Sequence, residues 1–233
     1  GKGYGPEILT VRLLNFANID EVAKEHGPVD FVLADLGVSS MQIDNPERGF
    51  SYKNDGPLDL RLNPQTGISA AERLKNISRQ ELLGMLTENS DEPYAEEISR
   101  AIEIKKGRPV ETTGRLREVI EKALEKVPES ERREAVKKSC QRTFQALQID
   151  IYNEFEVLYQ FLEKLPRVLA PGGRAAILTF HSGEDRLVKK SFKDFYKEGI
   201  YREISKEVIR PSAKECAANS RAKSNKMRWA IKA

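Results

Sequence analysis

The segment that most limits how this chain can fold is DFVLADLG, at residues 30–37. Residues 31–36 form a short apolar run, which is typical of a strand covered on both faces in a parallel sheet. The charged residue within this run is Asp35, near its carboxyl end, where open α/β sheets place their ligand sites. A strand at residues 8–14 and a short helix at residues 20–26 are also predicted. The chain therefore begins with a β-α-β pattern, which favours a parallel sheet.

A polar segment follows, at residues 37–61. It contains four acids, three basic residues, two prolines and three glycines, but few large apolar side chains that could pack it. Phe50, Tyr52, Leu58 and Leu60 argue against disorder. Long loops without structure of their own are usually functional or disordered, so we expect this segment to form part of a site.

The block at residues 66–138 has the apolar period of helices and no strand signal. Ser69 with Glu72, and Ser78 with Glu81, have the spacing of capping boxes at helix starts. This block interrupts the alternation of strands and helices, so we expect it to be an inserted helical subdomain.

The predicted α/β domain has a first part at residues 1–65 and a second part at residues 139–233. In the second part, a single long helix is expected to carry the apolar residues from Phe144 to Leu165. A Pro-Gly-Gly turn at residues 171–173 is expected to stop this helix. The elements expected after the turn are a strand at residues 175–180, a helix capped by Ser182 with Asp185, and strands at residues 201–205 and 227–231.

The composition limits the class of protein. With 39% hydrophobic and 32% charged residues, the 233-residue chain is expected to be soluble with a real core. No run approaches the roughly 20 apolar residues of a membrane span and no signal-peptide core is present, so we expect a cytoplasmic protein without a membrane partner. Cys140 and Cys216 form no disulfide framework, which fits a reducing compartment. Residues 205–233 hold eight Lys or Arg and two Glu, and this excess suits a polyanionic partner about as well as a solvated terminus.

Three predicted strand ends carry polar groups: residues 15–18, Asp35 and His181. In a parallel sheet these ends lie along one edge. Each has a structural alternative, because asparagines favour turns, an acid can cap a loop, and a lone histidine is more often structural. The histidines have no partner ligands at useful spacing and the cysteines have no adjacent base, so we expect neither a metal site nor a cysteine nucleophile.

Several of these segments occur together in one known family. DLGVSSMQIDNPERGFSYKNDGPLDLR, at residues 35–61, resembles the signature of the bacterial 16S ribosomal RNA cytosine-N4 methyltransferases, the MraW or RsmH family. The resemblance continues in family order in RTFQAL, LAPGGR, FHSGEDR, RPS and NSRAKS, at residues 142–147, 169–174, 180–186, 210–212 and 219–224. One departure is Gly183, where the family usually has Leu.

The resemblance implies a class I, Rossmann-like methyltransferase sheet with an inserted helical subdomain for substrate recognition. It implies S-adenosyl-L-methionine as cofactor and 16S ribosomal RNA or the small ribosomal subunit as partner, and it leaves a homodimer open. The cofactor-binding residues expected on this basis are Phe16, Asp35 and Gln42. The catalytic residues expected are Asp35, Ser39 and Ser40, and the residues expected near the RNA are Tyr52, Asn219, Arg221, Ser224 and Lys226.

Family members have further residues before the matched segment, which form the first strands of the sheet and a glycine-rich cofactor loop. We therefore expect the first two strands to be missing from this chain. For this reason a catalytically silent RNA- or ribosome-binding remnant is the main alternative to an active enzyme. A nucleotide-dependent oxidoreductase has no support beyond fold analogy.

Overall fold

The computed structural model describes residue 5, residues 7–104 and residues 107–233. The chain divides into two compact units. We call them the sheet unit, which combines residues 1–36 with residues 156–233, and the helical unit, which comprises residues 37–155. No helix among the described residues is long and apolar enough to cross a membrane.

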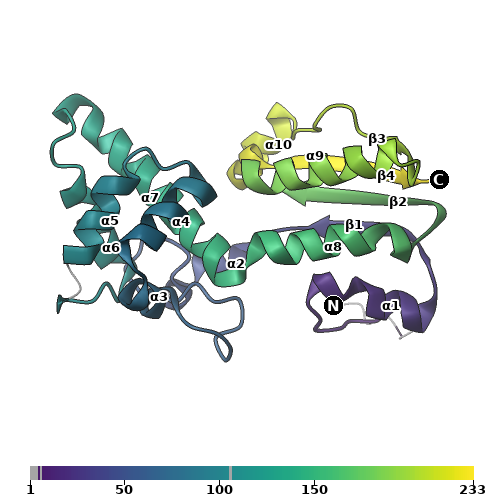
Figure 1. Ribbon diagram of the computed structural model, residues 1–233, viewed down its shortest axis with the longest axis horizontal. Coiled ribbons are helices and arrows are strands. Elements are labelled where there is room, and N and C mark those ends of the chain that lie inside the picture. Colours follow the sequence, from purple (N-terminus) through teal and green to yellow (C-terminus); the bar gives the residue numbers. More distant parts are fainter. Residues whose placement is uncertain (1–4, 6, 105–106) are drawn as a thin grey trace. The chain divides into compact units, whose positions relative to one another are not determined.

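The sheet unit contains a four-stranded mixed sheet (Figure 1). Its strands, in spatial order, are β1 (Val29–Asp35), β2 (Leu169–Thr179), β4 (Lys226–Lys232) and β3 (Tyr201–Ile204). β1 and β2 are parallel, whereas β4 is antiparallel to both β2 and β3. The predicted parallel pairing is therefore confirmed for β1 and β2, and the predicted C-terminal strands add antiparallel neighbours.

One face of this sheet is covered by helices. α8 (Glu154–Val168) and α9 (Ser182–Lys197) contribute apolar side chains to the same buried cluster as the strands. The members of the cluster include Leu158, Phe161, Leu162 and Leu165 of α8, Val188 and Phe192 of α9, and Val32, Ala175, Ile177, Tyr201 and Ala230 of the strands. Because alternate residues of a strand point to the same face, the strand members of this core share one side of the sheet.

Two expectations about the sheet unit are not met by the described residues. Residues 8–14 form no strand, because a strand needs a neighbour for its backbone hydrogen bonds and none of the described strands pairs with this segment. β1 is also not covered on both faces by the described residues, since Val32 is 9% exposed but Phe31 and Leu33 are 57% and 59% exposed. Phe31 lies with Trp229 in a shallow hollow of about 370 Å³ on the side opposite the helices.

The helical unit is built from short helices around a longer one. Its helices are α2 (Ser40–Asp44), the 3-10 helix η2 (Pro46–Arg48), α3 (Ala70–Asn76), α4 (Arg79–Ser90), α5 (Ala95–Ile104), α6 (Thr113–Ala123) and α7 (Glu129–Tyr152). Both predicted capping boxes are confirmed: Ser69 with Glu72 starts α3, and Ser78 with Glu81 starts α4. The described part of residues 66–138 contains no strand, as predicted.

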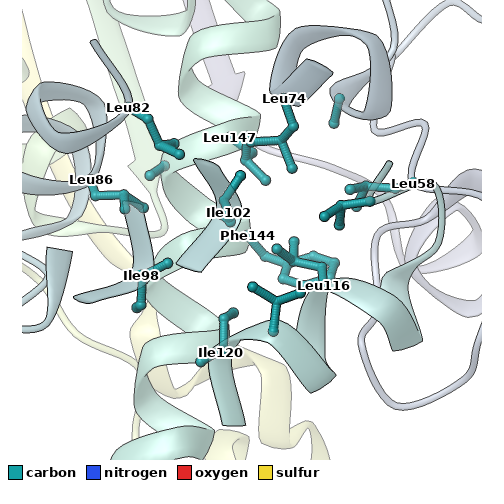
Figure 2. Close-up of a cluster of buried hydrophobic side chains, with 14 of the residues drawn as sticks. Leu58, Leu74, Leu82, Leu86, Ile98, Ile102, Leu116, Ile120, Phe144 and Leu147 are labelled. Atoms are coloured by element: carbon teal, nitrogen blue, oxygen red, sulfur yellow. The ribbon is translucent and has the colours of Figure 1, made fainter. Parts of the chain in front are cut away.

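Figure 2 shows the core of the helical unit, to which helices and the preceding loop both contribute. The labelled side chains are Leu58, Leu74, Leu82, Leu86, Ile98, Ile102, Leu116, Ile120, Phe144 and Leu147, each at most 3% exposed. Full burial of one such side chain contributes about 1.5–3 kcal/mol. Leu58 and the fully buried Leu60 therefore fix the loop after β1 to this unit.

The long helix expected from Phe144 to Leu165 is two helices. α7 ends at Tyr152, and the next residue, Asn153, has a left-handed φ of 49°. Asn adopts this conformation more readily than most residues because its short polar side chain can bond locally. The apolar stripe divides at this point, with Phe144 in the core of the helical unit and Leu158 in the core of the sheet unit.

The unit boundaries differ from the domain boundaries expected after residues 65 and 138. They fall after Leu36 and after Phe155, because the loop after β1 and most of α7 pack within the helical core. The Pro-Gly-Gly segment at residues 171–173 is not a separate turn but lies within β2, where the register against β1 shifts.

Candidate active site

One edge of the sheet unit brings together residues that are distant in sequence. Asp35 ends β1 and pairs in register with Leu178 of β2. Thr179 ends β2 and pairs with Lys226, the first residue of β4. Because β4 is antiparallel, its start lies beside the ends of β1 and β2. The register therefore confirms that Asp35 and the segment at His181 share an edge, and it adds Lys226 to that edge.

The turn that follows β2 is held by a buried carboxylate. Glu184 is 1% exposed, and its Oε2 accepts hydrogen bonds from the backbone N–H of Phe180 at 2.7 Å and of His181 at 3.3 Å. In return, the Glu184 N–H donates to His181 Nδ1 at 3.5 Å. The N-cap of α9 is therefore His181, and the expected cap by Ser182 with Asp185 is wrong. This capping box fixes the backbone at the end of β2, so His181 has a structural role.

A second charged pair ties α9 to the sheet. Arg228 of β4 donates to Asp185 through Nε at 2.7 Å and through Nη2 at 3.1 Å. The two side chains are only 7% and 16% exposed. The sequence pattern did not indicate the roles of Glu184 and Arg228, and it indicated a helix cap for Asp185. The available signal was the pair of acids in the first turn of the helix, where carboxylates favour the free backbone amides.

Phe16, predicted to contact the cofactor, lies in the 3-10 helix η1 (Phe16–Asn18) just before α1 (Ile19–His26). Its ring is 40% exposed and contacts Phe161 of α8 edge-on, with ring centroids 5.4 Å apart. The side chain of Asn15 accepts a hydrogen bond from the backbone N–H two residues on, so its turn role is confirmed.

A lysine of α8 holds this N-terminal segment to that helix. Lys164 Nζ lies 2.8 Å from Asp20 Oδ1 and donates to the carbonyl of Ala17 at 2.7 Å. Hydrogen bonds from Lys164 and Lys24 lower the pKa of Asp20 to about 2. The segment that carries Phe16 is therefore held to α8 of the sheet unit by the ion pair and hydrogen bond of Lys164.

Three of the predicted site residues lie at the start of α2, in the helical unit. Ser39 is the N-cap of α2: its Oγ accepts from the Gln42 N–H at 3.3 Å, and Gln42 Oε1 accepts from the Ser39 N–H at 2.8 Å. The amide oxygen of Gln42 is thus used in a capping box, while its NH₂ group keeps its donors. The side chain of Ser40 lies outside the described part of the structure. A shared site of these residues with Asp35 stays a prediction.

Tyr52, predicted to lie near the RNA, is half-buried in the helical unit. Its ring packs against Phe144, with centroids 5.7 Å apart, and burial raises the pKa of its hydroxyl. The neighbouring Phe50 is 7% exposed and belongs to the core. An RNA contact by Tyr52 stays a prediction.

Much of the polarity of residues 37–61 serves hydrogen bonds within the helical unit. Arg48 donates to the carbonyl of Arg61 at 2.6 Å, and Arg61 in turn binds Asp59 at 2.6 Å. Asp55 accepts from the Gly114 N–H at the start of α6 at 2.8 Å, and this bond lowers the pKa of Asp55. The polar composition of this loop, interpreted from sequence as a sign of a site, is therefore partly structural.

The C-terminal residues predicted near the RNA lie just before β4 or, in the case of Lys226, at its first residue. Asn219 caps the 3-10 helix η4 (Ser220–Ser224) by accepting a hydrogen bond from the Arg221 N–H at 3.1 Å. Arg221 and Ser224 are exposed, and Lys226 is half-buried at the candidate edge. The basic C-terminal stretch is not a frayed terminus, because it ends as an inner strand of the sheet.

Comparison with known proteins identifies the family. The MraW methylase family matches residues 4–233. The "Ribosomal RNA small subunit methyltransferase H 1" of Lachnoclostridium phytofermentans is 72% identical over 233 residues, which cover 99% of this chain and 64% of the relative. A protein of the same name from Agathobacter rectalis is 68% identical, with 99% and 67% covered, and the "Ribosomal RNA small subunit methyltransferase H 2" of Alkaliphilus metalliredigens is 66% identical, with 100% and 67% covered. The chain thus spans about two thirds of the length of these relatives. As the resemblance predicted, it belongs to the MraW methylase family.

Proposed function

We propose that this chain carries part of the active site of an S-adenosylmethionine-dependent methyltransferase that modifies N4 of a cytidine in the decoding region of 16S ribosomal RNA, in the cytoplasm. The observation that carries the proposal is the family match over residues 4–233, with relatives named as ribosomal RNA small subunit methyltransferases at up to 72% identity. The N4 position and the target region follow from the resemblance of residues 35–61 to the cytosine-N4 enzymes.

We also propose that the four strands are part of a class I methyltransferase sheet, and that the helical unit is the inserted subdomain for substrate recognition. The parallel pair β1–β2, followed by an antiparallel strand inserted between β2 and β3, supports this assignment. In such sheets the ligand lies outside the carboxyl ends of the parallel strands, where Asp35 is found.

Two residues of the sheet unit have side chains whose chemistry suits the cofactor. Asp35 offers an exposed carboxylate, which suits the ammonium or hydroxyl groups of S-adenosylmethionine. Phe16 offers a partly exposed ring that suits the adenine. In the helical unit, the NH₂ group of Gln42 is left to donate to an acceptor of the ligand.

The chemistry requires orientation more than a nucleophile from the protein. S-adenosylmethionine supplies a methyl group activated by a sulfonium. The lone pair of the cytosine N4 amine is delocalised into the ring, so positioning the amine in line with that methyl group removes several kcal/mol of the barrier, on the order of the gains known for oriented reactants. Asp35 is suited to accept a hydrogen bond from the amine as positive charge develops on it. We assign contacts with the RNA to Asn219, Arg221, Ser224 and Lys226, and Lys226 lies on the same edge as Asp35.

Cys140 is unsuited to the other common route to a methylated cytosine. Methylation at carbon 5 uses a thiolate that adds to the ring. Burial raises the pKa of Cys140 to about 12, and the side chain is fully buried, so it supplies no thiolate at neutral pH. Transfer to an exocyclic amine needs no such group.

The alternative is a catalytically silent RNA- or ribosome-binding remnant. The observation that favours it is the uncovered face of β1, where Phe31 and Leu33 are more than half exposed. β1 also lies at one end of the order of the four described strands.

One experiment separates the two functions. Cofactor binding is measured by calorimetry, and transfer of a labelled methyl group to 16S ribosomal RNA and to small subunits is measured with nucleoside analysis of the product. Both assays use the chain and a form extended to the length of its relatives. N4-methylcytidine formed by either form supports the proposal. RNA binding without cofactor binding or transfer in both forms would establish the remnant instead.

A further inference from the structure

The outer face of α9 differs from those of the other helices. Its inner side carries Val188 and Phe192 into the core of the sheet unit. Between residues 183 and 197 its exposed positions are five basic residues and one aromatic, namely Arg186, Lys189, Lys190, Lys193, Tyr196 and Lys197. We call this set the α9 basic face.

The spacing places these charges on one side of the helix. Arg186, Lys190, Lys193 and Lys197 follow one another at intervals of four, three and four residues, and Lys189 lies next to this row. With a rise of about 1.5 Å per residue, the row extends over roughly 16 Å. That length suits contact with several successive phosphates of a nucleic acid strand. Tyr196, which is 50% exposed, adds a ring on which a base can stack.

Among the described residues, an acid of α9 pairs with only one of the five basic residues of this face. Glu184 is buried under the turn after β2, and Asp185 binds Arg228. Asp194 lies 3.6 Å from Lys197. Within the described part of the chain, Arg186 and the three lysines from 189 to 193 form no ion pair. Like charges three and four residues apart destabilise a helix, so an ordinary solvated face usually carries acids among them.

α8 provides the comparison within the same unit. It also packs an apolar side into the sheet core, but its exposed positions from residue 156 onward are of mixed charge, namely Glu156, Tyr159, Gln160, Glu163 and Arg167. Single-signed charge is therefore a property of α9 and not of every helix that covers this sheet.

We propose that the α9 basic face is a binding surface for the RNA phosphate backbone, in addition to the C-terminal residues predicted to contact RNA. This inference rests on the proposed function, which supplies an RNA substrate. Phosphate contacts of this kind position a protein on RNA without reading its sequence. The surface would thus orient the ribosomal RNA toward the sheet edge that carries Asp35.

The test compares two double variants of the chain with the same change in charge. Lys190→Gln with Lys193→Gln removes two charges from the α9 basic face. Arg12→Gln with Lys24→Gln removes two exposed charges elsewhere in the sheet unit, where Arg12 pairs with Glu25 and Lys24 lies 2.9 Å from Asp20. Circular dichroism first verifies that both variants fold. Affinity for a labelled fragment of 16S ribosomal RNA is then measured by fluorescence anisotropy from 50 to 300 mM salt, on the order of the range in which counterion release is resolved.

The α9 variant is expected to bind RNA about tenfold more weakly at 0.1 M salt, with a slope of log affinity against log salt that is smaller by about one to two. The variant at Arg12 and Lys24 is expected to lose less than about twofold, because each of these basic residues already pairs with an acid. An α9 variant with the affinity and slope of the wild type would overturn the inference. So would an α9 variant that loses binding to vesicles of anionic lipid but not to RNA.

The methyl-transfer assay keeps this inference separate from the proposed function. Transfer by the wild type together with RNA binding that does not depend on α9 would refute the α9 surface alone. RNA binding that depends on α9, without methyl transfer by any form of the protein, would refute the methyltransferase alone.

Discussion

Gly49 lies in the loop after β1 at a point where a side chain does not fit. Its φ is 70°, and a Cβ built on it meets the carbonyl oxygen of Pro57 and comes within 2.9 Å of the backbone N of Asp59. These are backbone atoms of the segment that carries the buried Leu58. Gly49→Ala therefore has to displace the loop segment at residues 57–59, which the buried Leu58 fixes in the helical core.

The expected loss of unfolding free energy in Gly49→Ala has two parts. A left-handed conformation costs an L-residue about 1–2 kcal/mol, partly offset by the smaller entropy of the unfolded chain. Overpacking against backbone adds about 1–3 kcal/mol. Gly67 is the matched control, because its φ is 74° but no atom lies within 4 Å of a built Cβ. Gly67→Ala should therefore show the conformational part alone, roughly 0.5–1.5 kcal/mol.

Urea unfolding followed by circular dichroism measures both variants. We expect Gly49→Ala to lower the free energy of unfolding by about 2–4 kcal/mol and to exceed Gly67→Ala by at least about 1 kcal/mol. Fluorescence of Trp229, the single tryptophan, reports the sheet unit in the same samples. Equal losses in the two variants would refute the close approach of the loop segments as the reason for glycine at residue 49.

Two further predictions concern the sheet unit and the cysteines. Asp185→Ala leaves the Arg228 guanidinium buried without its partner and should lower the free energy of unfolding in urea by about 3 kcal/mol. Asp194→Ala, at a more exposed pair, should lower it by less than about 1 kcal/mol. Equal losses in the two variants would contradict the buried pair. Burial raises the pKa of Cys140 to about 12, so a thiol reagent at pH 8 should label Cys216 alone in the folded chain and both cysteines in urea. Fast labelling of two thiols in the folded protein would contradict the buried position of Cys140.

The parts of the fold that depend on local chemistry were predictable from sequence. The capping boxes that begin α3 and α4, the helix at residues 19–26 and the two C-terminal strands follow from spacing and alternation of a few residues. The position of Asp35 at the end of a strand was also predictable, because an apolar run preceded it.

The parts that depend on distant partners were not predictable. The apolar residues from Phe144 to Leu165 keep one helical period through Asn153, so the sequence pattern does not reveal that they serve two cores. Residues 8–14 have strand-like composition, but composition does not supply a neighbouring strand. The polar residues between Gly37 and Arg61 resembled a site, because a pattern does not distinguish a charge that binds a ligand from one that binds a backbone carbonyl.

The candidate site was predictable only in outline. Family resemblance marked FHSGEDR, but the buried bonds of Glu184 and Asp185 could be seen only in three dimensions. Lys226 was expected near RNA, and the antiparallel register of β4 places it on the same edge as Asp35.

The most direct test of the proposed methyl transfer compares the two ends of β1. Asp35 lies at the candidate edge, and Asp30 is an exposed acid at the opposite end of the same strand. Asp35→Ala and Asp30→Ala are made in a form extended to the length of the relatives, and methyl transfer to cytidine N4 of 16S ribosomal RNA is measured beside RNA affinity. Asp35→Ala should lower turnover by at least about 100-fold with RNA affinity unchanged, and Asp30→Ala should keep the turnover of the wild type. Wild-type turnover in Asp35→Ala would contradict the placement of the reaction at this edge of the sheet.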